Sequence, residues 1–127
     1  MQAKRCAPAD STRVVGTTGE DAAAAYLLRE GYIILARNYK TKVGEIDLIA
    51  MKKNTVCFFE VKSRGAGSLI DPMEAVTPRQ MKRIRRAAEW YLVRHPQRAR
   101  RALSFGVIGV HHDKTPVQIE CLLDAFE

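Results

Sequence analysis

The chain has 127 residues, which is enough for one domain with a single hydrophobic core. Hydrophobic residues make up 46% of it and charged residues 28%, and no apolar run reaches the length of a membrane-spanning helix, about 18 residues, so we expect a soluble protein that does not enter a membrane. Lys and Arg number 21 against 14 for Asp and Glu, and the formal charge of +7 favours a polyanionic partner, nucleic acid before an anionic membrane surface.

Residues 1–16 mix charged residues with Pro and Gly, and we expect a flexible tail ahead of a single domain over residues 17–127. The tail lacks the apolar core of a secretory signal. The three cysteines are far apart and form no CxxC pair, which argues against structural zinc and against a disulfide framework. Together these features predict a cytoplasmic protein.

An alanine-rich segment over Thr17–Glu30 is predicted to be the first helix, because a threonine can cap its start and Gly31 can end it. Glu20 lies in the first turn, where the helix dipole favours a carboxylate even if that carboxylate has no function. The next segment, Tyr32–Lys40, is rich in β-branched and aromatic residues and is predicted to be the first strand.

Two apolar runs, Gly44–Ala50 and Val56–Lys62, are predicted to form a β-hairpin whose turn is centred between Lys53 and Asn54. Side chains alternate between the two faces of such a hairpin. One face is wholly apolar and is predicted to lie in the core, with Ile46, Leu48, Ala50, Cys57, Phe59 and Val61.

The opposite face of this hairpin ends in charged side chains. In the predicted register Asp47 lies opposite Glu60, and Glu45 lies opposite Lys62. Two carboxylates facing each other on a half-buried sheet require a shared proton or a cation. Lys62 supplies one positive charge, and a divalent metal would supply the rest. A surface ladder of ion pairs is the alternative interpretation, although it leaves Asp47 beside Glu60 unexplained.

A second helix is predicted to begin at Thr77–Pro78 and to run to about Arg94. Its apolar residues recur at three- and four-residue steps, and its remaining faces are strongly basic. The residues expected to contact phosphate are Arg64, in a loop that follows the hairpin, and Arg79, Lys82, Arg83 and Arg86 on the helix. A solvated helix face is the alternative interpretation of the helical charges.

Leu103–Val110 and Pro116–Glu120 are predicted to be the fourth and fifth strands, and Leu122–Phe126 a last turn of helix. The element order is therefore α-β-β-β-α-β-β. Short turns make the first three strands an antiparallel meander, and the helical crossover makes strands three and four parallel. The predicted fold is α/β, with a mixed central sheet flanked by helices.

The spacing D-x(12)-E-x-K, formed by Asp47, Glu60 and Lys62, resembles the PD-(D/E)xK motif of restriction endonucleases and archaeal Holliday-junction resolvases, without the usual proline. More closely, the chain resembles the YraN-type family of small bacterial endonuclease-like proteins over roughly residues 14–126. The segments that carry this resemblance are Gly19-Glu20, Gly31-Tyr32, Arg37-Asn38-Tyr39, Gly44–Ile49 and Glu60–Arg64.

This resemblance implies a restriction-endonuclease-like fold and a metal-dependent endonuclease that uses Mg²⁺ or Mn²⁺. The implied substrate is nucleic acid, DNA more than RNA, in branched or single-stranded form, and a homodimer is expected by analogy.

The resemblance assigns catalytic roles to Glu20, Asp47, Glu60 and Lys62. Asp47, Glu60 and the backbone carbonyl of Val61 would bind the metal, and Glu20 would complete the metal shell directly or through water. Lys62 would orient the attacking water and hold the scissile phosphate, with Glu45 in support. Hard cations such as Mg²⁺ prefer this kind of oxygen ligand.

The sequence departs from the family pattern at two positions. Gly106 follows Phe105 where an acidic residue is usual, and Gln80 stands where the second helix usually has a lysine. Either change could weaken the grip on substrate or the packing beneath the site. The alternative function is therefore a nucleic-acid-binding module that keeps the fold with little or no turnover.

Overall fold

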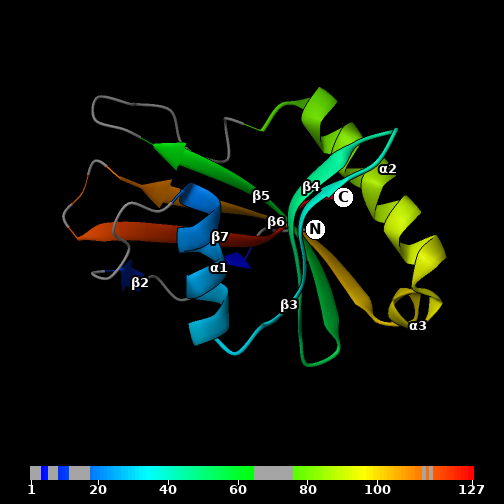
Figure 1. Cartoon of the computed structure of the whole chain (residues 1–127), viewed down its shortest axis with the longest axis horizontal. Helices are drawn as coiled ribbons and strands as arrows, with labels where there is room; N and C mark the ends of the chain where they lie inside the picture. The colour runs from blue at the N-terminus through cyan, green and yellow to red at the C-terminus, as the bar shows by residue number, and fades with distance from the viewer. Residues whose placement is uncertain (1–3, 6–8, 12–17, 65–75, 113, 115) are drawn as a thin grey trace.

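The computed structural model describes residues 4–5, 9–11, 18–64, 76–112, 114 and 116–127. These residues form one mixed sheet with helices on both of its faces (Figure 1). The strands are β1 (Lys4–Arg5), β2 (Ala9–Ser11), β3 (Ile33–Lys40), β4 (Glu45–Lys52), β5 (Thr55–Arg64), β6 (Ala102–His111) and β7 (Val117–Phe126).

The strand order is β1-β7-β6-β5-β4-β3, and β2 also pairs with β7. β5 and β6 are parallel, whereas every other pair is antiparallel, so the predicted meander and the predicted parallel crossover are both confirmed. The mixed α/β architecture is thereby confirmed, while the narrower restriction-endonuclease-like assignment stays a prediction.

Two helices cover the sheet, with α1 (Gly19–Arg29) on one face and α2 (Pro78–Arg94) on the other (Figure 1). A short helix, α3 (Pro96–Ala99), follows α2 and was not predicted. Each face has its own apolar cluster, in which Tyr26 and Leu27 of α1 or Ile84 and Tyr91 of α2 pack against the strands. No helix within the described ranges is long and apolar enough to span a membrane.

Both long helices begin with a reciprocal capping box. In α2 the Thr77 hydroxyl accepts a hydrogen bond from the Gln80 N–H at 3.1 Å, and the Gln80 side-chain carbonyl accepts one from the Thr77 N–H at 3.0 Å. Gln80, one of the two departures from the family pattern, therefore stabilises the start of the helix.

The C-terminal strand is longer than predicted. Leu122–Phe126 was predicted to be a helical turn, but these residues continue β7 and pair with β6. A bulge accommodates the extra length, with Asp124 at a positive φ and its N–H donating to the Ser104 hydroxyl at 2.8 Å. Phe126 then stacks on Phe105, with ring centroids 5.2 Å apart, so cross-strand packing outweighs the local helical signal.

The N-terminal segment contributes strands as well as the expected tail sequence. β1 and β2 both pair with β7, while most of residues 1–16 lie outside the described residues, so their predicted flexibility stays a prediction.

Cys57 is a free thiol, and its burial raises its pKa to about 12. Cys121 is disulfide-bonded, so the expectation of no disulfide is wrong for this residue.

Candidate functional site

The candidate site lies where β4 and β5 stop pairing. Their ladder runs from Lys52–Thr55 to Leu48–Phe59, which is the predicted register, and it ends there. β5 nevertheless continues to Arg64 beside β6, and β4 begins at Glu45 beside β3. The sheet therefore splits between β4 and β5, and Asp47 and Glu60 are the first residues beyond the last pair.

The start of β4 is held against α2 on one side of this split. Gly44 touches the backbone of Arg83, and a Cβ at that position would overlap the Arg83 carbonyl oxygen, so only glycine allows the approach. Ile46 accordingly packs in the α2 cluster with Ile84, whereas Leu48 packs in the α1 cluster. The prediction that Ile46 shares a face with Leu48 is wrong, because the strand turns toward α2 before it reaches the hairpin ladder.

Asp47 is fixed by a backbone group of the neighbouring strand. Its Oδ2 accepts a hydrogen bond from the Val61 N–H at 2.8 Å, and its carboxyl group is also hydrogen-bonded to Glu60. Burial raises the pKa of Asp47, and the hydrogen bonds from Val61 and Glu60 oppose that rise. The two carboxyl groups that the sequence placed opposite each other are therefore in direct contact.

Glu60 has a strongly raised pKa in this contact. Burial, and after it the negative charge of Asp47, raise its pKa to about 7 against the opposing effect of the positive charge of Lys62. The two residues are hydrogen-bonded to each other, and a hydrogen bond between two carboxyl groups needs a proton on one of them. The shared proton is one of the two solutions that the facing carboxylates required.

Lys62 forms an ion pair with Glu60, which lies two residues earlier on the same strand. Its Nζ lies 3.3 Å from Glu60 Oε1, and the two side chains are only 22% and 16% exposed. The predicted pairing of Glu45 with Lys62 is wrong: the β4–β5 ladder ends before those positions, and Glu45 is instead an exposed residue paired in register with Lys40 of β3. The charge of Glu45 still acts on the site, because it raises the pKa of Asp47.

Glu20 enters the same electrostatic cluster from α1. The helix starts against the end of β5, since a Cβ at Gly19 would overlap the Ser63 hydroxyl. Glu20 Oε1 is buried and has no hydrogen-bond partner in the part of the chain that the structure describes. Burial raises the pKa of Glu20, and the charge of Asp47 raises it further. A buried oxygen without a donor is a position where a ligand or a water is expected.

Asp21, the next acidic residue of α1, has a lowered pKa, whereas that of Glu20 is raised. Asp21 caps the helix through Thr18 and forms an ion pair with Arg37 of β3. The hydrogen bond from Arg37 is the main reason that the pKa of Asp21 is lowered. The two neighbouring carboxylates are thus distinguished by their surroundings: Asp21 is neutralised within the protein, and Glu20 is not.

The donor set fits a hard divalent cation that keeps part of its hydration shell. No group of three or more His, Cys, Asp or Glu close enough to share a metal occurs among the described residues. Mg²⁺, however, is usually bound by one or two carboxylates together with waters and phosphate oxygens. Asp47 and Glu60 would supply the two carboxylates, and the orphaned oxygen of Glu20 would accept a hydrogen bond from a metal-bound water.

The basic residues predicted to contact phosphate divide between two places. Arg79, Lys82, Arg83 and Arg86 are exposed along α2, whose backbone touches Gly44 three residues before Asp47. Arg64 ends β5 two residues after Lys62, rather than lying in a loop as predicted, and its side chain lies outside the described residues. Arg85 of the same helix is engaged elsewhere, since its Nη1 donates to the Glu127 carbonyl at 2.7 Å.

Gly106, the second departure from the family pattern, lies in the packing layer beneath the site. It pairs with Phe59 in the parallel β5–β6 ladder, and a Cβ there would lie 2.6 Å from the Phe59 ring and 2.8 Å from the Leu122 carbonyl oxygen. Phe59 is fully buried in the α1 cluster. The lack of a side chain at Gly106 therefore leaves space for the Phe59 ring.

Two features of the site carry no sequence signal that local reasoning could use. The Val61 N–H is a backbone donor, and its bond to Asp47 depends on the split of the sheet. The ion pair between Asp21 and Arg37 joins residues 16 positions apart on different elements. The glycines before Glu20 and Glu45 were visible in the sequence, but their role as close-approach points becomes clear only from their neighbours.

The chain matches the family described as Uncharacterised protein family UPF0102 over residues 19–110, a span that contains the three carboxylates Glu20, Asp47 and Glu60 and the lysine of the site. A UPF0102 protein of Rhodopseudomonas palustris (strain ATCC BAA-98 / CGA009) is 46% identical over 110 residues, covering 87% of this chain and 83% of the relative. One from Bradyrhizobium diazoefficiens is 43% identical over 110 residues, covering 87% and 81%, and one from Chlorobium phaeobacteroides (strain BS1) is 48% identical over 82 residues, covering 65% of each. The predicted family membership is thereby confirmed, and the chain belongs to the UPF0102 family.

Proposed function

We propose that the chain is a metal-dependent endonuclease that hydrolyses phosphodiester bonds in DNA with Mg²⁺ or Mn²⁺. One observation carries this proposal: two largely buried carboxyl groups are hydrogen-bonded to each other beside a lysine, at a split in the sheet of a protein with a formal charge of +7. A structural role explains this arrangement poorly, because buried like charges destabilise a fold. Strongly perturbed ionisable groups of this kind are typical of functional sites.

The residues present define what each would do in such a reaction. Asp47, Glu60 and the Val61 carbonyl would hold the metal, and Glu20 would bind one of its waters. The ion supplies charge neutralisation at the phosphate and a water of lowered pKa. Glu60 must release its proton before it can act as a ligand, so its raised pKa links metal binding to deprotonation.

Lys62 is suited to the scissile phosphate. Its ammonium group offers three donors, and its ion pair to Glu60 holds it at the site in the absence of substrate. In the proposed hydrolysis a water oxygen forms a bond to phosphorus, the bond from phosphorus to the leaving oxygen breaks, and the leaving oxygen takes up a proton. Lys62 would stabilise the charge that gathers on the non-bridging oxygens during this exchange.

The test is cleavage of branched, single-stranded and duplex DNA in Mg²⁺ and Mn²⁺ by the parent and by Asp47→Asn and Lys62→Ala. Glu89→Gln, an exposed carboxylate of α2, and Arg29→Ala, an exposed cation of α1, are the charge-matched controls. We expect each site variant to lose at least about 100-fold in rate, in the range of other single catalytic groups, while both controls cut like the parent. Equal cutting by parent and site variants would contradict the proposal.

A second candidate function is a nucleic-acid-binding module without turnover. The observation that favours it is the state of the carboxylates: within the described residues no three acidic groups converge, and Glu60 is already engaged by Asp47 and Lys62. This candidate predicts salt-dependent DNA binding that survives EDTA and Lys62→Ala, with no cleavage in any metal.

A further inference from the structure

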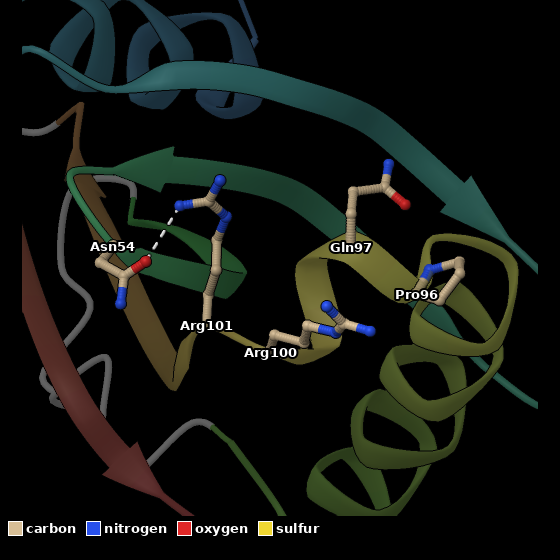
Figure 2. Close-up of a pocket in the computed structure, with 5 residues that line it drawn as sticks. All are labelled: Asn54, Pro96, Gln97, Arg100 and Arg101. Atoms are coloured by element: carbon tan, nitrogen blue, oxygen red, sulfur yellow. Dashed lines mark hydrogen bonds between the residues drawn. The ribbon is translucent and has the colours of Figure 1, made fainter.

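A pocket of about 550 Å³ lies at the far end of β5 from the carboxylates (Figure 2). It is bordered by the β4–β5 turn, by α3 and by the start of β6, and its lining residues are Asn54, Pro96, Gln97, Arg100 and Arg101. Two of these five residues are arginines, two carry amides, and none is acidic. We infer that this pocket binds a phosphate group of the DNA backbone, as a second anchoring point for the substrate of the proposed nuclease.

The segments of the chain that flank the pocket carry positive charges and no acidic residue that would balance them. Residues 90–112 contain four arginines and no Asp or Glu, and residues 48–59 contain two lysines and no Asp or Glu. Two acidic residues at the C-terminal end of β7, Asp124 and Glu127, line a separate pocket with Leu103. A local excess of cations without neighbouring carboxylates attracts polyanions.

Arg94 and Arg98, which precede the pocket, are engaged within the protein. Arg94 stacks over the Trp90 ring at 4.0 Å, and Arg98 is hydrogen-bonded to the Tyr91 side chain. Arg100, by contrast, is exposed and makes no side-chain hydrogen bond or ion pair with any residue that the structure describes. Its guanidinium is therefore available to a ligand.

Arg101 is held in place by one hydrogen bond, and its remaining N–H groups can donate to a ligand. Its Nη1 donates to Asn54 Oδ1 at 3.0 Å, and the backbone of the same turn accepts a hydrogen bond from the Ala102 N–H at 3.0 Å. Figure 2 shows Arg101 extending toward Asn54 while Arg100 lies on the side of the pocket toward Pro96. A guanidinium has five N–H donors and Asn54 uses one, so the others are pre-positioned for an oxyanion.

The position of the pocket sets the length of the ligand. Asn54, in the turn directly before β5, is six residues from Glu60, or about 20 Å at the usual rise of β-structure. Duplex DNA rises 3.4 Å per base pair, so a duplex needs about six base pairs to reach from the carboxylates to the pocket. This inference rests on the proposed function, in which the carboxylates and Lys62 contact the scissile phosphate. It predicts that the protein also binds a phosphate of the DNA at a distance from the bond that is cut.

The experiment measures DNA binding by fluorescence anisotropy in EDTA, where no cleavage occurs, with a duplex of about 16 base pairs over a range of salt concentrations. The variants are Arg100→Ala, Arg100→Ala/Arg101→Ala and Asn54→Ala, which releases Arg101 without a change in charge. Arg29→Ala removes one exposed cation from α1 and is the matched control. Circular dichroism and thermal unfolding establish that each variant is folded.

We expect Arg100→Ala to reduce the slope of log K against log salt by about 0.9, and the double variant by about twice that amount. Asn54→Ala should weaken DNA binding but reduce the slope of log K against log salt by less than Arg100→Ala does. Arg29→Ala should match the parent in both affinity and slope. If the pocket variants match the parent and the control in affinity and slope, the inference is wrong. A parent that binds DNA through the pocket but never cuts it would contradict the proposed function alone.

A free nucleotide could offer the same chemistry, and a second titration separates the two sources. ATP is expected to bind weakly and to compete with DNA at the pocket. If Arg100→Ala abolished tight ATP binding and left DNA binding unchanged, the pocket would be a nucleotide site and its assignment to the DNA backbone would be overturned.

Discussion

Asp47 accepts a hydrogen bond from the backbone N–H of Val61 at 2.8 Å, at the point where β4 and β5 have ceased to pair. The carboxylate takes the place of a main-chain acceptor and so fixes its own position relative to β5. A buried N–H without an acceptor is costly, which makes this bond a structural element as well as a feature of the candidate site. Function and stability can therefore be separated by the choice of substitution at this residue.

Asp47→Ala and Asp47→Asn should differ in stability while sharing the loss of activity. Alanine leaves the Val61 N–H without its acceptor, and we expect a loss of about 1–3 kcal/mol in the free energy of unfolding. Asparagine keeps an acceptor for Val61 and offers an amide donor to Glu60, so its stability should be within about 0.5 kcal/mol of the parent or higher. Urea unfolding without metal measures both, and equal destabilisation would show that the bond to Val61 contributes little.

The stability of the metal-free protein should fall as pH rises through the titration range of Glu60. Its pKa is about 7 in the folded protein against an ordinary value of 4.5, so between these values the folded state holds a proton that the unfolded state has lost. The folded state is therefore favoured fully below pH 4.5, and this advantage is lost by about pH 7. The expected loss is on the order of 1–3 kcal/mol.

Glu60→Gln is the variant that tests the origin of this pH dependence. Glutamine keeps a donor toward Asp47 and carries no charge, so the variant should be more stable than the parent above pH 7 and should show a flatter profile between pH 5 and 8. Urea unfolding at several pH values gives the comparison. A parent profile that is already flat, or one that is unchanged by the substitution, would assign the pH dependence to other groups.

The hairpin of the site could be predicted because its information is local. Alternation of apolar residues and a polar turn were enough to give the register from Lys52–Thr55 to Leu48–Phe59, and that register alone placed Asp47 near Glu60. The helix ends followed from threonine caps in the same local way. Whether these residues catalyse a reaction is a further step that the sequence supports only by resemblance.

The split of the sheet could not be predicted, because it depends on a contact between distant elements. Gly44 must meet the backbone of Arg83 before β4 turns toward α2, and that turn moves Ile46 to the other cluster and Glu45 away from Lys62. Strict alternation assumes an unbroken ladder and therefore fails at these two residues. The pocket at Arg100 and Arg101 was missed for a similar reason, since Asn54 is 47 residues away from Arg101 in sequence.

The two close-approach glycines should respond differently to alanine. At Gly44 the Cβ would overlap a backbone carbonyl of α2, which cannot move alone, so we expect Gly44→Ala to destabilise the protein by about 2–4 kcal/mol. At Gly19 the Cβ would overlap the Ser63 hydroxyl, which is the end of a side chain. Gly19→Ala should cost less, about 1 kcal/mol, since small side chains can rotate away.

Ser63→Ala provides the control for this pair of substitutions. It removes the overlapping oxygen, so Gly19→Ala/Ser63→Ala should recover most of the stability lost in Gly19→Ala. No comparable second substitution relieves Gly44→Ala, because the opposing atom belongs to the main chain. Thermal unfolding of the three variants and the double variant decides the matter, and the absence of recovery would mean that Gly19 is needed for its backbone rather than for space.

Glu20 should contribute to metal affinity at a cost in stability. Its Oε1 is buried without a hydrogen-bond partner among the described residues, and the charge of Asp47 raises its pKa. We expect Glu20→Gln to leave the metal-free protein as stable as the parent or more stable, and to weaken Mn²⁺ binding by about 10–100-fold, the range for groups that orient a metal site. Asp21→Asn is the matched control on the same turn, and it should behave in the reverse way: it loses its ion pair with Arg37 and so destabilises the fold, while Mn²⁺ affinity by calorimetry stays unchanged. If both substitutions changed Mn²⁺ affinity equally, the effect would be one of general charge and Glu20 would have no special place at the site.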